Sequence, residues 1–430
     1  MKRKAIIWIS AALLVTLLVG CCTFTQAGGA GDTITLMASQ DWIQDAEMEL
    51  GEKFTELTGI KVDYQIIPSD QYPNLLMTKL NMGECTDIWC TQSGRFDVVT
   101  TYNVEKNAVD LSGEPWAGNV DVLAAAEISV DGRLYGQPTQ DLTSSWAIAY
   151  NKAIFQELSL EVPTTYAEFA AVCDAILAAG KIPVYEPVSD GWHHVLWLPE
   201  TGVKAAADDP TIIEQWNNNQ ATFAGNQTLL TILAQIKEMA DKGYWGDNFM
   251  SNQYTDTPKN IASGEYVMTV ANQGLGAEVN GADPNFPIDD IGYFVIPLAD
   301  NQTLNVNPSG PSRFIFSGSK NIDAAKQYLD FIASTESLTY MTENVGKFNK
   351  LAFSNAPSTY SPTIQEFYDR YATSGTVLQT AVKYVNPQWM DMGADLSAML
   401  LGEMTPEEVL QNIDKRRTEQ AIAAGDIAWK

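Results

Sequence analysis

An alternation of strand-like and helix-like segments early in the chain constrains its fold more than any other feature. Short apolar runs give way to stretches with apolar residues on one helical face, and Gly59 and Gly83 stand directly after the two expected helices. Glycine favours the left-handed backbone that ends many helices. This alternation predicts a parallel, doubly wound α/β sheet, in which ligands bind beyond the carboxyl ends of the strands. The expected strands are at 34–38, 62–67 and 88–90, and the expected helices are at 45–58 and 72–82.

The later chain changes character several times, which indicates more than one folding unit. Thr165 and Glu168 have the spacing of a capping box, and Thr405-Pro406 forms a second helix start near the C-terminus. The sequence has 430 residues, more than a single hydrophobic core usually covers. We therefore expect two domains, and two lobes that exchange the chain more than once would explain the order of the segments.

The N-terminal segment is expected to direct export and not to join the fold. Basic residues at 2–4 precede a nearly unbroken apolar run at 5–19, which is shorter than the roughly 20 residues of a membrane-spanning helix. The run ends in Leu18-Val19-Gly20-Cys21, which resembles the lipobox of bacterial lipoproteins. The prediction is a signal peptide at 1–22 with a lipobox ending at Cys21/Cys22, lipid attachment to Cys21, and a flexible tether at 23–31. A plain signal peptide cut elsewhere is the alternative.

The charge balance limits the classes of partner. The chain carries 53 acidic and 26 basic side chains, a formal net charge of −27. This charge argues against nucleic acid and anionic membrane surfaces as partners, and it favours a neutral or cationic ligand. After export Cys85, Cys90 and Cys173 remain, and their odd number and irregular spacing do not fit a disulfide framework. We expect three small buried apolar side chains, with a Cys85–Cys90 disulfide as the alternative.

The sequence lacks the motifs of catalysis, phosphate binding and metal binding. His193 and His194 are adjacent, and no cluster of Cys or His surrounds them. Gly274-Leu275-Gly276 lacks the third glycine of a dinucleotide motif, and neither a Gly-x-Ser-x-Gly nor a Walker-type loop occurs. We therefore expect no cofactor, no metal and no enzymatic activity. Because carboxylates are abundant, a glycosidase pair stays open as an alternative.

Aromatic side chains stand among small polar residues in several expected loops. Sugars present apolar C–H faces and a rim of hydroxyl groups. An indole ring offers a flat apolar surface to such a face, and Asp, Asn, Gln and Arg meet hydroxyls with directional hydrogen bonds. One Trp alone is more often a core residue, so the indication of sugar binding comes from the group. The loops are 41–42, 92–95, 190–194 and 387–391.

Several short stretches, taken in order along the chain, carry a family resemblance. They are FTELTGIKV at 54–62, LNMGECTDI at 80–88, DGRLYGQP at 131–138, YNK at 150–152, VPTTY at 162–166, NPSGPS at 307–312 and YVNPQWMD at 384–391. With the lipobox, they make the chain resemble the extracellular sugar-binding proteins of ATP-binding-cassette (ABC) importers, the family 1 solute-binding proteins that include the maltose-binding protein. Cys85-Thr86 stands where that family usually has a small Ala-Pro pair.

The resemblance implies a two-lobed, periplasmic-binding-protein-like (Venus-flytrap) fold of class II type, with hinge crossover strands and a helical C-terminal part. Such lobes close around a ligand by a hinge motion. Crossovers are expected near 146–150, 268–272 and 309–316. The implied first lobe comprises 32–144 and about 273–315, and the implied second lobe comprises 145–272 and about 316–430.

The resemblance also implies ligand contacts from loops at strand ends. Asn272 and Gln273 stand where a stacking Trp is common in maltose-type members, which argues against a maltodextrin ligand. Each candidate has a structural alternative, such as a surface ion pair for Arg95 or a helix cap for Glu186. The candidates are Asp41, Trp42, Gln92, Arg95, Ser144, Ser145, Glu186, Trp192, His193, Asn272, Gln273, Trp389 and Asp391.

The function that the resemblance implies is capture of a mono- or oligosaccharide by lobe closure and its delivery to the membrane permease subunits of an ABC-type importer. The implied protein is exported, monomeric and lipid-anchored at the cell membrane, facing the cell surface or the periplasm. Two alternatives stay open: a surface glycoside hydrolase, and a receptor that presents its ligand to a membrane sensor.

Overall fold

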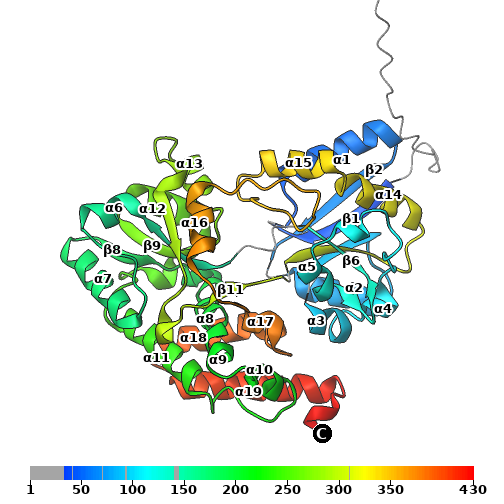
Figure 1. Ribbon diagram of the computed structural model, residues 1–430. Helices are drawn as coiled ribbons and strands as arrows, with labels where there is room; N and C mark the ends of the chain where they lie inside the picture. The colour runs from blue at the N-terminus through cyan, green and yellow to red at the C-terminus, as the bar shows by residue number, and fades with distance from the viewer. Residues whose placement is uncertain (1–32, 41, 70, 93, 140–144, 309) are drawn as a thin grey trace, which may run out of the picture.

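The computed structural model describes residues 33–40, 42–69, 71–92, 94–139, 145–308 and 310–430, which form two α/β lobes (Figure 1). Each lobe is built around one sheet, and this confirms the predicted two-lobed α/β fold. The first sheet has the order β2 (Lys61–Ile67), β1 (Thr33–Ser39), β3 (Ile88–Gln92), β12 (Pro311–Ile315), β6 (Gly136–Pro138). The second has the order β10 (Ile291–Phe294), β7 (Ala147–Asn151), β9 (Tyr266–Ala271), β8 (Ile182–Tyr185).

In the first lobe, β1 pairs in parallel with both β2 and β3, as the early alternation predicts. β12 follows all four strands of the second sheet in the chain and enters antiparallel between β3 and β6. Trp89 of β3 stacks on Phe314 of β12, with ring centroids 4.6 Å apart, so this late strand is held by core packing as well as by hydrogen bonds. The helices of this lobe are α1 (Asp45–Thr58), α2 (Tyr72–Met82), α3 (Arg95–Thr100), α4 (Val104–Asn107), α5 (Val122–Glu127), α14 (Ile322–Ile332) and α15 (Thr335–Asn344), with a small hairpin of β4 (Ser129–Val130) and β5 (Arg133–Leu134).

In the second lobe, β8 is parallel to β9, whereas β7 runs antiparallel to both β9 and β10. One face of α11 is apolar and buried, because Leu229, Ile232, Leu233 and Ile236 all lie in the core of this lobe. Two short strands, β11 (Leu304–Val306) and β13 (Ser374–Thr376), pair separately. The helices are α6 (Lys152–Glu157), α7 (Tyr166–Ala178), α8 (Trp197–Thr201), α9 (Val203–Asp208), α10 (Ile212–Asn217), α11 (Gln227–Asp241), α12 (Thr257–Ser263), α13 (Leu275–Ala282), α16 (Pro362–Arg370), α17 (Leu378–Ala381), α18 (Trp389–Leu400) and α19 (Pro406–Ala423).

The helix ends follow the local sequence signals. Gly59 and Gly83 end α1 and α2 with φ of 78° and 71°, the left-handed conformation that costs glycine little. The capping box of Thr165 with Glu168 starts α7, and an equivalent box starts α19 at Thr405. These predicted boundaries are confirmed.

The division of the chain between the lobes differs from the implied one. β10 lies in the 273–315 stretch expected in the first lobe, yet it pairs with β7 of the second sheet. α14 and α15 lie in the stretch expected in the second lobe, yet their buried faces pack in the core of the first, where Tyr328 meets Phe54 with ring centroids 5.5 Å apart. An amphipathic helix shows that it has a buried face but does not show which core receives that face.

Three further observations bear on the sequence predictions. Among the described residues, Cys85, Cys90 and Cys173 carry free thiols, and Cys90 and Cys173 are buried. No described helix has both the length and the apolar character required to cross a membrane. The described chain also contains no group of three or more His, Cys, Asp or Glu side chains suited to hold a metal ion. The predicted signal peptide, Cys21 and the tether lie outside the described residues.

Candidate functional site

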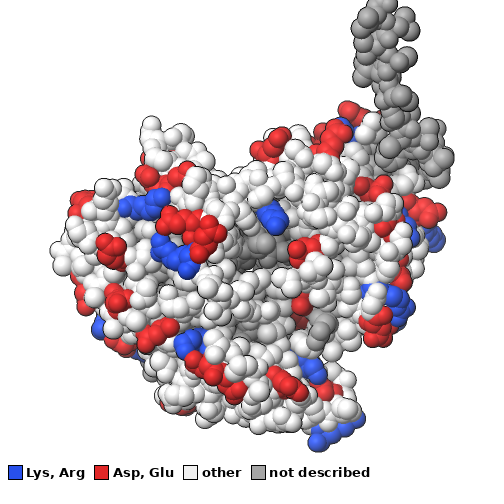
Figure 2. Space-filling model, in the orientation of Figure 1, with Lys and Arg blue, Asp and Glu red and all other residues white. Residues whose placement is uncertain are grey.

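The two sheets are connected through the edges at which β3, β6 and β9 end. In the first sheet, Pro311 at the start of β12 pairs with Gln92 at the end of β3, and Ser312 pairs with Pro138 at the end of β6. In the second, Ala147 at the start of β7 pairs with Ala271 at the end of β9. Two connections, from β6 to β7 and from β11 to β12, therefore run between the sheets. They join the edge where β3 and β6 end to the edge where β9 ends. Figure 2 shows the molecule hollowed between the two lobes.

Three aromatic rings gather at this edge of the second sheet. Trp146 precedes β7, Trp192 lies in the loops after β8, and Tyr254 begins a short 3₁₀ helix. Their ring centroids are 5.8 Å apart for Trp146 and Trp192, 6.1 Å for Trp146 and Tyr254, and 5.2 Å for Trp192 and Tyr254. All three side chains are partly exposed. We call Trp146, Trp192 and Tyr254 the aromatic floor.

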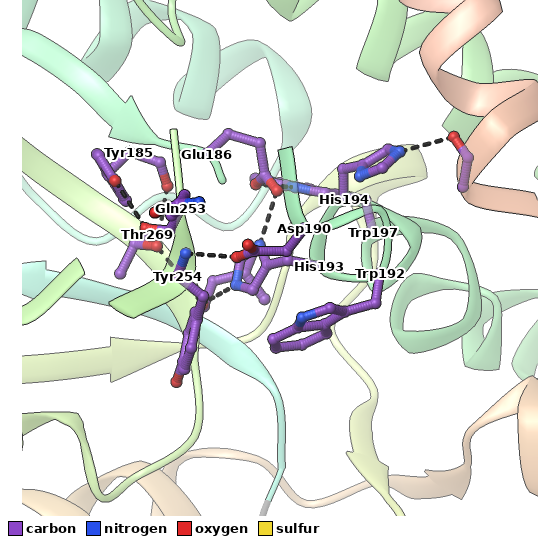
Figure 3. A network of polar contacts seen from close by, with 12 residues as sticks. Tyr185, Glu186, Asp190, Trp192, His193, His194, Trp197, Gln253, Tyr254 and Thr269 are labelled. Carbon is purple, nitrogen blue, oxygen red and sulfur yellow. Dashed lines mark hydrogen bonds and ion pairs between the residues drawn. The ribbon is translucent and has the colours of Figure 1, made fainter. Parts of the chain in front are cut away.

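A buried polar group lies beside Trp192 and Tyr254 of the aromatic floor (Figure 3). Glu186, directly after β8, contacts His193 Nδ1 through Oε1 at 2.7 Å, and its Oε2 accepts a hydrogen bond from Trp197 Nε1 at 2.7 Å. His193 Nε2 lies 2.9 Å from the carbonyl oxygen of Val270 in β9. Glu186, His193 and Trp197 are each 0 % exposed. Their polar atoms are thus occupied inside the lobe, and this placement does not support the predicted ligand contacts of Glu186 and His193.

The loop that carries Trp192 is held by α18. Trp389, the first residue of α18, donates from Nε1 to the carbonyl oxygen of Trp192 at 3.1 Å. Gly191 adopts a φ of 75°, and a side chain at Gly393 would place its Cβ 1.9 Å from the Gly191 carbonyl oxygen. Loop and helix therefore approach as closely as backbone allows. The structure brings the predicted Trp192 and Trp389 together, whereas Asp391 is exposed on the first turn of α18.

Ser145 and Gln273 form a polar joint where the chain enters the second lobe. The Ser145 amide donates to Gln273 Oε1 at 3.0 Å, and Gln273 Nε2 donates back to the Ser145 carbonyl at 2.6 Å. Asn305, at the exit toward the first lobe, donates from Nδ2 to the Trp146 carbonyl at 3.0 Å and also contacts buried Glu200. Burial raises the pKa of Glu200 well above its usual range. These contacts fix both lobe-connecting segments beside the aromatic floor.

The first lobe contributes the opposing edge. Trp42 is partly buried and meets Tyr72 edge to face, with ring centroids 5.3 Å apart, so much of its indole belongs to the core. Gln92 is partly exposed at the end of β3, and Arg95 is the first residue of α3. The predicted contacts Asp41 and Ser144 lie outside the described residues.

In the described part of the chain, residues of both lobes also line hollows between them. A polar hollow between them contains the predicted Asn272 and Gln273, and its lining is Asn272, Gln273, Gly274, Lys347, Asn349, Tyr360 and Tyr368. A second hollow is lined by Gly94, Phe96 and Asp97 of the first lobe and by Gln379, Thr380, Val382, Tyr384 and Asn386 of the second. Each of these hollows is therefore lined by residues of both lobes.

Sequence reasoning missed two members of the aromatic floor. Trp146 stands before a buried strand, where its ring has the pattern of a strand residue, and Tyr254 is far from Trp192 in the chain. The one signal for Trp146 was its place beside an expected crossover. Tyr254 is placed by Asp190, whose carboxylate accepts the Tyr254 backbone N–H. No local pattern in the sequence shows that contact.

The chain is similar to one family of known proteins. Residues 49–360 match the family described as bacterial extracellular solute-binding protein. A curated relative, the multiple sugar-binding protein of Streptococcus mutans, is 21% identical over 333 residues, covering 76% of this chain and 77% of its own.

Solved structures with the same fold include a chitin oligosaccharide binding protein, with a TM-score of 0.76, 17% identity, and coverage of 92% of this chain and 100% of that one. They also include the binding protein RafE in complex with raffinose, with a TM-score of 0.73, 18% identity, and coverage of 90% and 99%. At these identities the structural likeness establishes the fold.

Proposed function

Because the chain belongs to the family of bacterial extracellular solute-binding proteins, we propose that it captures a carbohydrate between its two lobes and delivers it to an ABC-type importer. The relatives named above are binding proteins and not enzymes. The proposed cycle has an open form, in which the sheet edges are separated, and a closed form that the importer recognises. A ligand shifts this equilibrium only through contacts that differ between the two forms.

The aromatic floor is the observation that carries this proposal. Three partly exposed rings within about 6 Å of one another present an apolar surface at the edge where ligands of such sheets bind. Sugar rings stack on such surfaces with their C–H faces. We propose that the opposing Gln92 and the first-lobe loops meet hydroxyl groups of the sugar and that Asn272 adds a polar contact, whereas the buried Ser145 and Gln273 hold the lobe-connecting segment in place. Asp41, Arg95, Ser144 and Asp391 stay as proposed contacts from the family resemblance.

The relatives narrow the class of sugar to test first. One structural neighbour is described as binding chitin oligosaccharide, and another is in complex with raffinose. The position that follows β9 here is Asn272-Gln273 and offers no indole, so an oligosaccharide other than a maltodextrin is the favoured ligand. A formal net charge of −27 favours a neutral sugar over an anionic one.

We further propose that the protein is a monomer anchored by lipid on Cys21. The apolar run at 5–19 and the Leu18-Val19-Gly20-Cys21 string support this, with 23–31 as the tether. One acyl chain binds a bilayer weakly, so stable anchoring needs more than one chain. The protein would then face outward from the membrane, beside its permease.

Calorimetric titration of the mature chain tests the function. The panel contains raffinose, chitin oligosaccharides, xylan oligosaccharides, maltodextrins and their monosaccharides. We expect saturable binding of at least one neutral oligosaccharide with one site per chain. Binding of a peptide or a metal ion, with no heat from any carbohydrate, would refute the proposal.

A further inference from the structure

His193 has a hydrogen-bond acceptor opposite each of its ring nitrogens. Nε2 lies 2.9 Å from the Val270 carbonyl oxygen, and Nδ1 lies 2.7 Å from Glu186 Oε1. A carbonyl oxygen has no proton to donate, so Nε2 carries one. A second proton then lies between Nδ1 and Glu186, because two facing lone pairs would repel. His193 and Glu186 together therefore hold one proton more than a neutral imidazole beside an ionised carboxylate would hold.

The surroundings favour that second proton on the imidazole. Trp197 donates to the other Glu186 oxygen at 2.7 Å, which stabilises the carboxylate anion. The His193 ring centroid lies 5.1 Å from that of Trp192, 5.2 Å from that of Tyr254 and 6.0 Å from that of Trp146. A cation within about 6 Å of aromatic rings is attracted by their electron-rich faces. Each charge of the pair thus has its own stabilising partners.

The neighbouring titratable groups are engaged elsewhere. His194 directs Nε2 to the Gly393 carbonyl of α18 at 2.8 Å. Asp190, in the loop before Trp192, binds the Tyr254 backbone N–H. The charged form of His193 is therefore set by Glu186 and by the three rings.

We infer that His193 is a buried imidazolium, paired with Glu186, which holds Trp146, Trp192 and Tyr254 in the arrangement on which the ligand stacks. The inference rests on the proposed function, because it assigns His193 and Glu186 as positioning residues of the same site. Neither has exposed surface from which to touch the sugar. Their effect on binding passes through the rings.

The variant Glu186→Gln removes the charge of the carboxylate but keeps the size and hydrogen-bonding pattern of the side chain. The Gln carboxamide oxygen can still accept from Trp197, and its NH₂ can donate to Nδ1 of a neutral His193, whose Nε2–H still donates to Val270. Every hydrogen bond is kept while the ion pair is removed. Loss of the imidazolium leaves the aromatic rings without their central cation, so we expect sugar affinity to fall by about tenfold.

The experiment combines nitrogen-15 NMR of the histidine rings at neutral pH with calorimetric sugar titration. In the wild-type protein without ligand, both His193 ring nitrogens are expected to be protonated, and in Glu186→Gln only Nε2. Glu47→Gln is the matched control, because Glu47 is also a buried carboxylate paired with a cation, Arg313, but in the first lobe. It should lower the melting temperature without changing sugar affinity.

The outcomes are decisive in either direction. One protonated ring nitrogen in the wild type overturns the inference, and this measurement needs neither the variant nor a ligand. Wild-type affinity in Glu186→Gln, or an equal loss of affinity in Glu47→Gln, overturns the positioning role. A wild-type protein that binds no sugar refutes the proposed function instead, and it leaves the protonation result standing on its own.

Discussion

Asn386 of the second lobe donates a hydrogen bond from Nδ2 to Oδ2 of Asp97 in the first lobe at 2.8 Å. Asp97 lies in α3, next to the predicted ligand loop 92–95, and only 6 % of it is exposed. Asn386 and Asp97 are 289 positions apart in the chain, and their hydrogen bond joins the two lobes directly. It buries a carboxyl group that would meet water once the lobes separate.

Lobe closure is therefore expected to depend on pH. Burial raises the pKa of Asp97 from 3.8 to about 6, against the lowering effect of its hydrogen bonds from Asn386 and Thr101. In the open form the pKa of Asp97 returns toward 3.8. At pH values between 3.8 and about 6, lobe closure is therefore coupled to the uptake of a proton by Asp97. Lowering the pH from about 7.5 to about 5 should then tighten sugar binding, on the order of tenfold.

Asp97→Asn isolates this effect. An Asn at position 97 keeps an acceptor for Asn386 but does not titrate, so the variant should bind with nearly the same affinity at both pH values. Calorimetry at the two pH values provides the measurement. A variant that keeps the full pH dependence would assign it to another group.

Trp192→Ala should weaken sugar binding by about 1–3 kcal/mol, because it removes a ring of the aromatic floor. Trp389→Ala should cost affinity indirectly, since Trp389 holds the Trp192 backbone. Trp245→Phe is the control: Trp245 is fully buried and stacks with Trp197 at 5.9 Å, behind the floor. It should lower the melting temperature and leave affinity unchanged. If Trp192→Ala instead lowers the melting temperature and leaves affinity unchanged, Trp192 is a core residue and not part of the ligand site.

Gly393→Ala should separate α18 from the loop that carries Trp192. Its Cβ would meet the Gly191 carbonyl at 1.9 Å, so helix and loop must move apart. We expect a loss of roughly 1–3 kcal/mol of unfolding free energy together with weaker sugar binding. Gly281→Ala in α13 is the matched helical control, with no atom within 4 Å of the added Cβ. If both variants melt alike and bind alike, the close approach has no consequence.

Glu47→Ala should destabilise the first lobe strongly. Glu47 receives Arg313 Nε at 3.0 Å and the Tyr328 hydroxyl at 3.0 Å, and both members of the ion pair are almost fully buried. Removing the carboxylate leaves an uncompensated buried guanidinium, which costs about 3–5 kcal/mol. Thermal or urea unfolding measures this loss of unfolding free energy. A loss below about 1 kcal/mol would show that water reaches Arg313.

Cys21→Ser should release the protein from the membrane. The full-length chain expressed in a bacterial host should fractionate with membranes, and the variant should appear as soluble or unprocessed protein. Mass spectrometry of the mature N-terminus identifies the lipid. An unmodified N-terminus at another residue would support the plain signal peptide.

The local features of the fold were predictable because their causes are local. Gly59, Gly83 and the Thr165–Glu168 box mark helix ends through their own backbone and side-chain contacts. The partner of an element is a different matter. β10 and α14 both carry buried apolar residues, but the lobe to which each belongs depends on which sheet edge and which core it can pack against. That information is spread over the whole chain.

The candidate site was predictable to a similar degree. Trp192 and Trp389 stand among small polar residues in the sequence, and the structure brings them together, with Trp389 at the start of α18 and not in the expected loop. Glu186 and His193 have the same loop signature but point inward, because Trp197 of α8 donates to Glu186 and the Val270 carbonyl of β9 faces His193. Trp146 and Tyr254 join the aromatic floor through contacts with residues distant in sequence. Side-chain direction at a strand end is decided by tertiary contacts, which the loop composition does not show.

A crystal structure with the tightest-binding oligosaccharide of the panel tests the central claim most directly. The account predicts a sugar ring stacked on Trp146, Trp192 or Tyr254, held between the lobes with the Asp97–Asn386 contact formed. A sugar bound on an outer surface, or a floor whose three rings turn into the core of the second lobe, would contradict it.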